Sequence, residues 1–227
     1  MVMGVQRSGT NALFRALSAG SSVQAFNERA DGPWYEQFFL RPESMLRPLL
    51  ASTEQPILLK PISETKRRSV ADVLVEFESH QPRLVWVYRD PVNCFYSHTQ
   101  RWSGFVDDPT GFAAHWCHRN AFLLDALDEH GDQIAVVRYR ELHADPQVFR
   151  SLQGFLGTEG RYRFRADRAE GRKRVSTTDQ AVIDGACASI FERLNQARTC
   201  PGRSLSVPAR WAERWRVQSA KNQQTPL

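Results

Sequence analysis

The sequence Gly-Val-Gln-Arg-Ser-Gly-Thr-Asn-Ala-Leu at residues 4–13 decides how the fold begins. It follows an apolar start at residues 1–3 and leads into a helical pattern, so we expect a strand, a phosphate loop and a helix in that order. Small residues let backbone N–H groups surround an anion, and the positive end of the helix dipole adds to the attraction. Arg7 and Thr10 supply further donors. The stretch therefore predicts a site for a phosphate-like group.

This loop lacks two features of the loops that bind nucleotides for hydrolysis. In the pattern G-x-x-x-x-G-K-[ST], a lysine and then a serine or threonine follow the second glycine. Here Gly4 and Gly9 have that spacing, but Thr10 and Asn11 come next. Both the usual lysine and the hydroxyl that binds magnesium are therefore missing.

Length and composition favour one globular domain. The 227 residues are 41% hydrophobic and 24% charged, and a chain of this size buries about 70% of its unfolded surface. We expect a domain over residues 1–217 and a polar, frayed tail over residues 218–227. The first apolar stretch breaks at residues 6–7, and no later run resembles a membrane span, so we expect a cytoplasmic protein.

Cysteines and charge limit the classes of ligand. The four cysteines, at 94, 117, 187 and 200, lack metal-ligand spacing, so we expect unpaired thiols and no metal site. The net charge of +5 and the pI near 9.3 fit a nucleic acid, but they fit a small polyanion equally well. The location of the basic residues has to decide between these partners.

Five short apolar runs predict strands, because they are rich in β-branched and aromatic residues. They cover residues 1–3, 23–26, 57–59, 84–88 and 134–137. The intervening patterns predict helices at residues 13–17, 70–77 and 112–127. Alternating strands and helices favour an α/β fold with a five-stranded parallel sheet flanked by helices. Ligands of such sheets bind at the carboxyl ends of the strands, where the polar motifs of this sequence fall.

A second polar motif, Leu-Val-Trp-Val-Tyr-Arg-Asp-Pro, occupies residues 84–91. Arg89 ends the predicted strand, and Pro91 suits the first turn of a helix. Ser97 then lies about two turns into that helix, where its hydroxyl can face an anion also held by Arg89. The sequence thus predicts a second anion site.

Together the two motifs resemble those of sulfotransferases that use 3′-phosphoadenosine 5′-phosphosulfate (PAPS). In that family a [KR]-S-G-T loop holds the 5′-phosphosulfate, and the matching residues are Arg7, Ser8, Gly9 and Thr10, continued by Asn11. An R-[DN]-P-x5-S element holds the 3′-phosphate, and the matching residues are Arg89, Asp90, Pro91 and Ser97. The resemblance implies a P-loop kinase-like sulfotransferase fold, with PAPS as co-substrate and adenosine 3′,5′-bisphosphate (PAP) as product.

The resemblance also implies in-line transfer of a sulfuryl group, without metal, to an acceptor hydroxyl. A sulfuryl group carries less negative charge than a phosphoryl group, so fixed cations and N–H donors can stabilise its transfer. Arg7 would stabilise the negative charge that develops on the bridging oxygen as its bond to sulfur breaks, and Lys60 would offer a second cation. In the branch similar to heparan-modifying enzymes, a glutamate just after the second strand accepts the proton, and Glu28 occupies that place. The phenol-and-steroid branch uses a histidine where this chain has Ile62.

Two regions add partial matches. Residues 161–174 are strongly basic, and Gly171, Arg172 and Lys173 resemble the late loop with which the family covers the 3′-phosphate. The aromatic residues at 34, 35, 38 and 39 follow Glu28 and either line an acceptor pocket or belong to the core. The acceptor stays open among a sugar, a lipid and a secondary metabolite, and so does the oligomeric state.

Two other functions remain possible at this point. A magnesium- and ATP-dependent small-molecule kinase would share the opening strand, loop and helix, although its lysine is missing. A non-enzymatic RNA- or anion-binding protein would use the basic run at 161–174, where interleaved aromatics can stack on bases. We favour the sulfotransferase, with a small-molecule or carbohydrate acceptor and no nucleic-acid partner.

Overall fold

The computed structural model describes residues 1–20, 22–101, 108–164 and 170–198. Strands and helices are interspersed within these ranges, and the paired strands of the central sheet are parallel. The predicted α/β class is confirmed. The predicted tail at 218–227 and the end of the predicted domain lie outside the described residues, so those boundaries stay predictions.

The central sheet has three parallel strands in the order β1-β6-β7. These are β1 (Val2–Gly4), β6 (Leu84–Tyr88) and β7 (Ile134–Arg138). A separate parallel pair is formed by β2 (Gln24–Asn27) and β5 (Ile57–Lys60).

All five predicted strands are present, but the prediction of one five-stranded sheet is wrong. β5 contacts β1, yet the hydrogen-bonded ladders of the described residues leave them in different sheets. β1 has three residues, and Gly4 at φ 152° has already left the extended conformation. Little regular backbone therefore remains for a second ladder.

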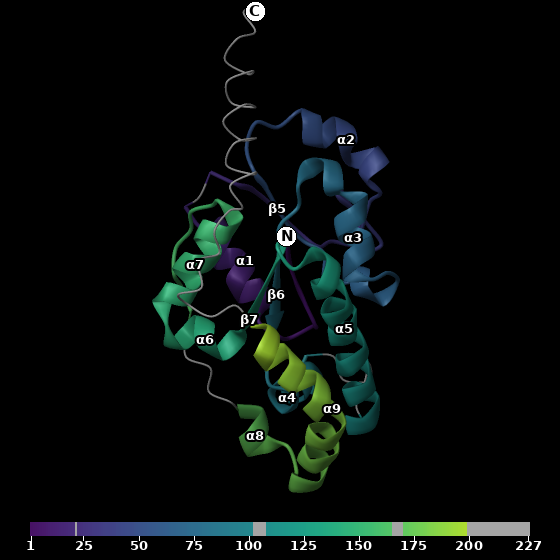
Figure 1. The fold of residues 1–227 in the computed structure, drawn as a ribbon. Coiled ribbons are helices and arrows are strands. Elements are labelled where there is room, and N and C mark those ends of the chain that lie inside the picture. Colours follow the sequence, from purple (N-terminus) through teal and green to yellow (C-terminus); the bar gives the residue numbers. More distant parts are fainter. Residues whose placement is uncertain (21, 102–107, 165–169, 199–227) are drawn as a thin grey trace, which may run out of the picture.

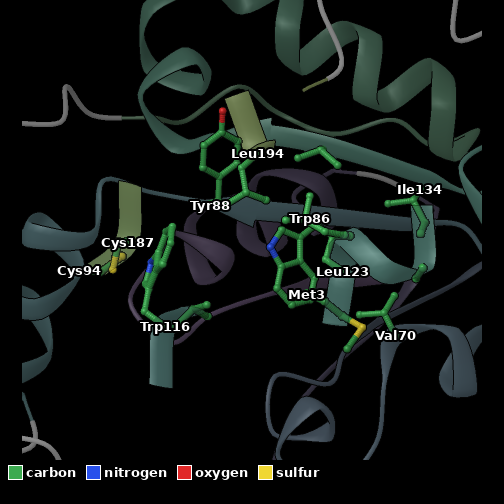
Figure 2. Close-up of a cluster of buried hydrophobic side chains, with 14 of the residues drawn as sticks. Met3, Val70, Trp86, Tyr88, Cys94, Trp116, Leu123, Ile134, Cys187 and Leu194 are labelled. Carbon is green, nitrogen blue, oxygen red and sulfur yellow. The ribbon is translucent and has the colours of Figure 1, made fainter. Parts of the chain in front are cut away.

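Alternate residues of β6 point to opposite faces of the sheet. Trp86 and Tyr88 belong to one core, whereas Val85 and Val87 belong to another. Figure 2 shows the first core, in which Trp86 lies among side chains from the neighbouring helices. Because both faces are covered, the strand reads as one continuous apolar run.

Helices cover both faces of this sheet (Figure 1). One side carries α1 (Thr10–Ser18), α6 (Tyr139–Ala144) and α7 (Pro146–Leu156). The other carries α4 (Pro91–Thr99), α5 (Pro109–His130) and α9 (Thr177–Ala197), with the short α8 (Glu170–Arg174) packed on α4. Three of these helices begin with Asp-Pro, the aspartate accepting a hydrogen bond from a first-turn N–H: α4, α5 and α7.

A third, smaller core lies under β2 and β5. It is covered by a hairpin of β3 (Tyr35–Glu36) and β4 (Phe39–Leu40), by α2 (Glu43–Ala51) and by α3 (Val70–Glu76). The short helices η1 (Glu64–Lys66) and η2 (Glu78–His80) flank α3. Trp34 and Tyr35 are buried here, so these two aromatics are core residues.

No helix in the described ranges is long and apolar enough to cross a membrane. Cys94, Cys117 and Cys187 form no disulfide, as the sequence predicts, and Cys200 lies outside the described residues.

Candidate active site

The loop after β1 requires its two glycines. A Cβ on Gly4 would lie 2.3 Å from the carbonyl oxygen of Val87, and one on Gly9 would lie 2.0 Å from the Tyr139 ring. Gly9 also has a φ of 108°, which side chains rarely adopt. Arg7 adopts a φ of 70°, a conformation that costs a residue with a Cβ about 1–3 kcal/mol. The loop is thus pressed against β6 and Tyr139 in one strained conformation.

The helix after this loop presents unsatisfied donors. α1 begins at Thr10 with no side-chain cap and no acidic residue in its first turn. The first N–H groups of any helix lack partners within the helix, so they attract an anion. Ser8 is fully buried beside them, and its Oγ has no hydrogen-bond partner among the described residues. An anion bound at the loop would accept hydrogen bonds from the first N–H groups of α1 and from the Ser8 hydroxyl.

The two sequence motifs meet through a side chain. Arg7 Nε donates to the carbonyl oxygen of Ser97 at 3.1 Å and to Ser97 Oγ at 3.0 Å. The Arg89 guanidinium lies over the Tyr139 ring, 5.2 Å from its centroid. Burial lowers the pKa of Arg7, and the neighbouring charges of Arg101 and Arg89 lower it further. Positive charge is therefore concentrated where the sequence predicts anions.

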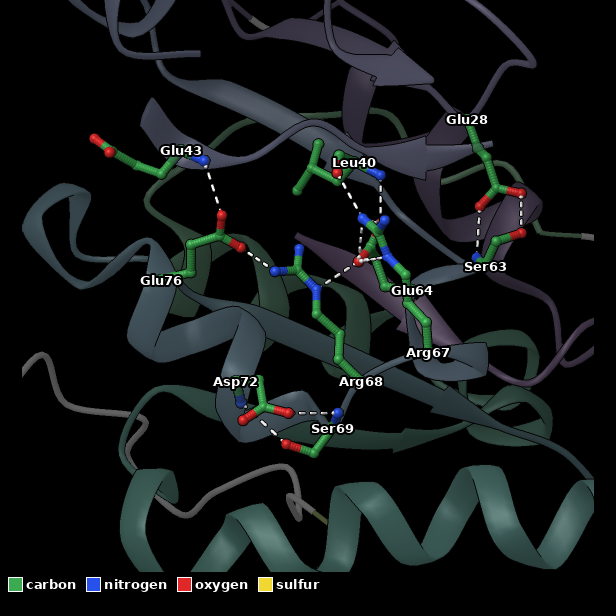
Figure 3. A network of polar contacts seen from close by, with 10 residues as sticks. All are labelled: Glu28, Leu40, Glu43, Ser63, Glu64, Arg67, Arg68, Ser69, Asp72 and Glu76. Atoms are coloured by element: carbon green, nitrogen blue, oxygen red, sulfur yellow. Dashed lines mark hydrogen bonds and ion pairs between the residues drawn. The ribbon is translucent and has the colours of Figure 1, made fainter. Parts of the chain in front are cut away.

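Glu28 and Lys60 lie at the ends of neighbouring strands. Asn27 pairs with Lys60 in the register of β2 and β5, so Glu28 follows directly beside the lysine. Its carboxylate accepts the Ser63 N–H at 2.7 Å and the Ser63 hydroxyl at 2.9 Å (Figure 3). Lys60 is buried, and burial lowers the pKa of its ammonium while the Glu28 charge raises it. The two predicted catalytic side chains are thus brought together.

A buried polar network holds the chain around Ser63. Glu64 is fully buried and accepts hydrogen bonds from the Leu40 N–H, from Arg67 at 3.1 Å and from Arg68 at 2.6 Å. Arg67 also donates to the Leu40 carbonyl at 2.8 Å, which ties the hairpin to η1 (Figure 3). Because a buried charge must be fully paired, this network favours one arrangement of the turn that carries Ser63.

Arg119 of α5 supports the same turn, and the sequence analysis missed it. Its Nη2 donates to the Ile62 carbonyl, while Nε and Nη1 have no partner among the described residues. Only 1% of Arg119 is exposed, and burial lowers its pKa to about 10 against the opposing charge of Glu28. A single arginine in a helical pattern carries no signal of burial, since its surroundings come from distant segments.

A cavity of about 830 Å³ joins these groups. The predicted site residues that line it are Arg7, Gly9, Thr10, Asn11, Glu28 and Lys60, together with Arg89 and Ser97. Its described lining carries six cations, from two lysines and four arginines, against the single carboxylate of Glu28. Within the described ranges, no three histidine, cysteine, aspartate or glutamate side chains gather as a metal site would need. The cavity is suited to a polyanion.

The loop occupies the middle of this cavity, because β1 lies between β6 and β5. On one side stand Arg89, Ser97 and Arg101, which with Arg7 we call the α4 side. On the other stand Glu28, Lys60, Ser63, Lys66 and Phe38, which we call the hairpin side. A ligand bound at the loop can therefore reach both groups.

The late basic loop is placed differently. A Cβ on Gly171 would lie 2.6 Å from Asn93 Cα, so α8 packs tightly on α4. Arg172 binds Asp184 at 2.8 Å and Asp90 at 2.6 Å, and these hydrogen bonds raise the pKa of its guanidinium. Gly171, Arg172 and Lys173 are absent from the lining of the described cavity. Their contact with a nucleotide stays a prediction.

Comparison with solved structures identifies the architecture. The structure matches that of a sulfotransferase from Alicyclobacillus acidocaldarius with a TM-score of 0.58, over 88% of this chain and 96% of that one. The chain has the fold of a sulfotransferase. The identity is 19%, so the likeness concerns the fold alone. The predicted sulfotransferase fold is confirmed, whereas the heparan-type branch stays a prediction.

A second match is the mouse sulfotransferase SULT7A1 complexed with PAP, with a TM-score of 0.45 and 11% identity over 92% of this chain and 71% of that one. No family model and no curated protein matches the sequence.

Proposed function

We propose that the protein is a cytoplasmic sulfotransferase that moves a sulfuryl group from PAPS to an acceptor hydroxyl. One observation carries the proposal: in a chain with this fold, Arg7 of the loop and Ser97 of the second motif hydrogen-bond inside a single cationic cavity. PAPS has an anionic group at each end, so a single PAPS molecule in this cavity would contact both motifs.

The described residues fit such a donor. The N–H groups at the start of α1 and the buried Ser8 hydroxyl would hold the 5′-phosphosulfate, and Arg89 with Ser97 would hold the 3′-phosphate. PAPS carries about four negative charges at neutral pH: about two on the 3′-phosphate, about one on the 5′-phosphate and about one on the sulfate. The six cations in the lining are sufficient to balance them.

The chemistry follows from the placement of the charged groups. The acceptor oxygen forms a bond to sulfur as the bond between sulfur and the bridging oxygen breaks, and the electron pair stays on the phosphate of PAP. Arg7 and Lys60 would stabilise the negative charge that develops there. Glu28 would take the hydroxyl proton, since two hydrogen bonds from Ser63 fix the direction of its carboxylate. Catalysis then depends on positioning and fixed charge.

Thermal unfolding tests the proposal without knowledge of the acceptor. PAP, 5′-AMP and ATP with magnesium are each added to the protein. PAP at about a hundred times its dissociation constant stabilises by about 2.7 kcal/mol, which raises Tm by about 5–10 °C. We expect the shift with PAP, its loss in Arg89→Ala, and its retention in Arg150→Ala, which changes an exposed arginine on α7. Stabilisation by ATP with magnesium alone would contradict the proposal and favour a kinase.

A further inference from the structure

The contact between α5 and α9 brings two thiols together. These helices pack on one another more extensively than any other helix pair in the described ranges. On α9, Ile183, Cys187 and Leu194 lie on one face at helical spacing and are fully buried in the first core. Cys117 of α5 reaches this face, and its Sγ lies 3.6 Å from the Sγ of Cys187. Two reactive side chains, 70 residues apart in the chain, are therefore in contact.

The backbone of α9 is close enough for a covalent bond between these sulfurs. Cys117 Sγ lies 3.5 Å from the Ala186 carbonyl oxygen, so the side chain reaches the main chain of the neighbouring helix. A disulfide needs an S–S distance of about 2.05 Å and Cα atoms about 4.4–6.8 Å apart. From 3.6 Å the sulfurs of Cys117 and Cys187 have to approach by about 1.5 Å, which rotation of the two side chains can supply.

The two thiols differ in exposure and in acidity. Cys187 is fully buried, and Figure 2 shows it in the first core with Cys94. Cys117 is only partly buried, at the edge of that core. The hydrogen bond between the two thiols lowers the pKa of Cys117 and, together with burial, raises the pKa of Cys187. Because the thiolate is the form that oxidants attack, Cys117 should react first.

The proposed transfer reaction uses neither thiol. Cys117 and Cys187 are absent from the lining of the described cavity. Among the three described cysteines, Cys117 alone is not buried, since Cys94 is also enclosed in the core. An exposed thiol with a buried thiol in contact behind it is the arrangement of a pair that oxidises reversibly.

We propose that Cys117 and Cys187 form a reversible oxidation site, at which hydrogen peroxide converts the two thiols into a disulfide between α5 and α9. The Cys117 thiolate attacks a peroxide oxygen and becomes a sulfenic acid, as the O–O bond breaks and water leaves. The Cys187 sulfur then attacks the sulfenic sulfur, so that the S–S bond forms and a second water leaves. The thiols lose two electrons and two protons in total, and the peroxide takes up both. A thiol reductant restores the pair.

The bond would stabilise the fold. It closes a loop of 70 residues between α5 and α9. Closing a loop of this length stabilises a protein mainly because it restricts the unfolded chain. We expect oxidation to raise Tm by about 5–15 °C, and we expect reduction to abolish the shift.

Mass spectrometry and thermal unfolding of the full chain test the proposal. The reduced, folded protein is treated with hydrogen peroxide, the remaining thiols are alkylated, and peptide mapping locates the disulfide. We expect a bond between Cys117 and Cys187, the loss of two of the four thiols, the rise in Tm, and full reversal by dithiothreitol. Cys94→Ala, which removes a buried thiol outside the pair, and Cys200→Ser should both form the same bond. The result does not depend on PAP binding, since neither thiol of the pair lines the cavity.

Two variants separate the roles of the two thiols. Cys117→Ser removes the thiolate that reacts first, so peroxide should form no disulfide and leave Tm unchanged. Cys187→Ala leaves Cys117 without its partner, so excess peroxide should carry Cys117 on to sulfinic acid, which dithiothreitol does not reverse. If Cys187→Ala does not fold, Cys117→Ser alone decides the pairing.

Three results would overturn the proposal. The first is retention of all four thiols after treatment, or a disulfide that joins any other cysteines. The second is a fall in Tm on oxidation, because the bond would then distort the contact between α5 and α9. The third is full reversal by dithiothreitol in Cys187→Ala, because Cys187 would then not be the thiol that protects Cys117.

Discussion

The α4 side and the hairpin side of the cavity are built in different ways. The α4 side comes from two short segments, in which Gly9 allows the loop to turn and Arg7 reaches Ser97 directly. On the hairpin side, Glu28 is held by a hydrogen bond from Ser63. The backbone turn that carries Ser63 is itself stabilised by Glu64 and by Arg119 of α5. A site made of local motifs is readable in a sequence, whereas a site held by distant side chains becomes visible only in the structure.

The largest expected effect falls on the α4 side. Gly9→Ala places a methyl group 2.0 Å from the Tyr139 ring at a φ of 108°, so the loop has to move. We expect PAP binding to be lost and the free energy of unfolding to fall by about 2–4 kcal/mol. Denaturant unfolding and calorimetry would measure both.

The matched control is Gly154→Ala, in the exposed face of α7, where an added Cβ meets nothing within 4 Å. That change should stabilise the protein by up to about 1 kcal/mol, because alanine favours a helix. Equal effects of the two substitutions would mean that the loop has no special geometry.

The next effect belongs to the hairpin side alone. Glu28→Gln keeps the shape of the side chain but removes the proton acceptor, so we expect kcat to fall about 10²–10⁴-fold with PAP affinity unchanged. Glu54→Gln, in an exposed loop outside the cavity, is the control. Full turnover by the Glu28 variant would show that Glu28 is not the proton acceptor. The hairpin side would then not differ from the α4 side by containing the base.

A smaller effect should come from the support behind Glu28. Arg119→Met leaves the Ile62 carbonyl without its donor, so the turn that carries Ser63 loses one constraint. We expect kcat to fall about tenfold while PAP affinity changes less than twofold, because a small misplacement of a catalytic group is enough. Arg119→Lys should recover part of the loss. A parallel loss of PAP affinity would show that Arg119 serves both sides.

The smallest effect concerns the loop and pH. His115 lies one turn before Arg119 on α5, and its Nε2 is 3.2 Å from Gln6 Oε1 in the loop. Burial lowers the pKa of His115 to about 4, and positive charges add to the shift, from Arg119, His98, Lys66 and His118.

Below its ordinary pKa of about 6.5, this histidine binds a proton in the unfolded chain but not in the folded one, so stability falls as the pH falls from 6.5 to 4. In His115→Gln, the loss of unfolding free energy between pH 6.5 and pH 4 should be smaller by up to about 2 kcal/mol. Equal slopes of unfolding free energy against pH in the two proteins would contradict this.

The polar motifs could be read from the sequence because each depends on neighbours in the chain. The strand at 84–88 and the helix start at Pro91 were predicted correctly, since a continuous apolar run followed by Asp-Pro leaves few alternatives. The hairpin was not predicted, because its turn residues Gln37 and Phe38 lack every usual turn signal. The structure itself keeps them there through the hydrogen bonds of the Phe38 N–H.

By itself, the sequence determined the α/β class, the positions of the five strands and the positions of the two polar motifs that we expect to bind anions, because hydrophobic periodicity and turn chemistry act over a few residues. Only the tertiary structure decided that these strands form two sheets, that Arg172 pairs with Asp90 and Asp184, and that Arg119 is buried and donates to the Ile62 carbonyl. These features depend on contacts between segments far apart in the chain. Burial and charge pairing have no local pattern, so they arise only when the chain has folded.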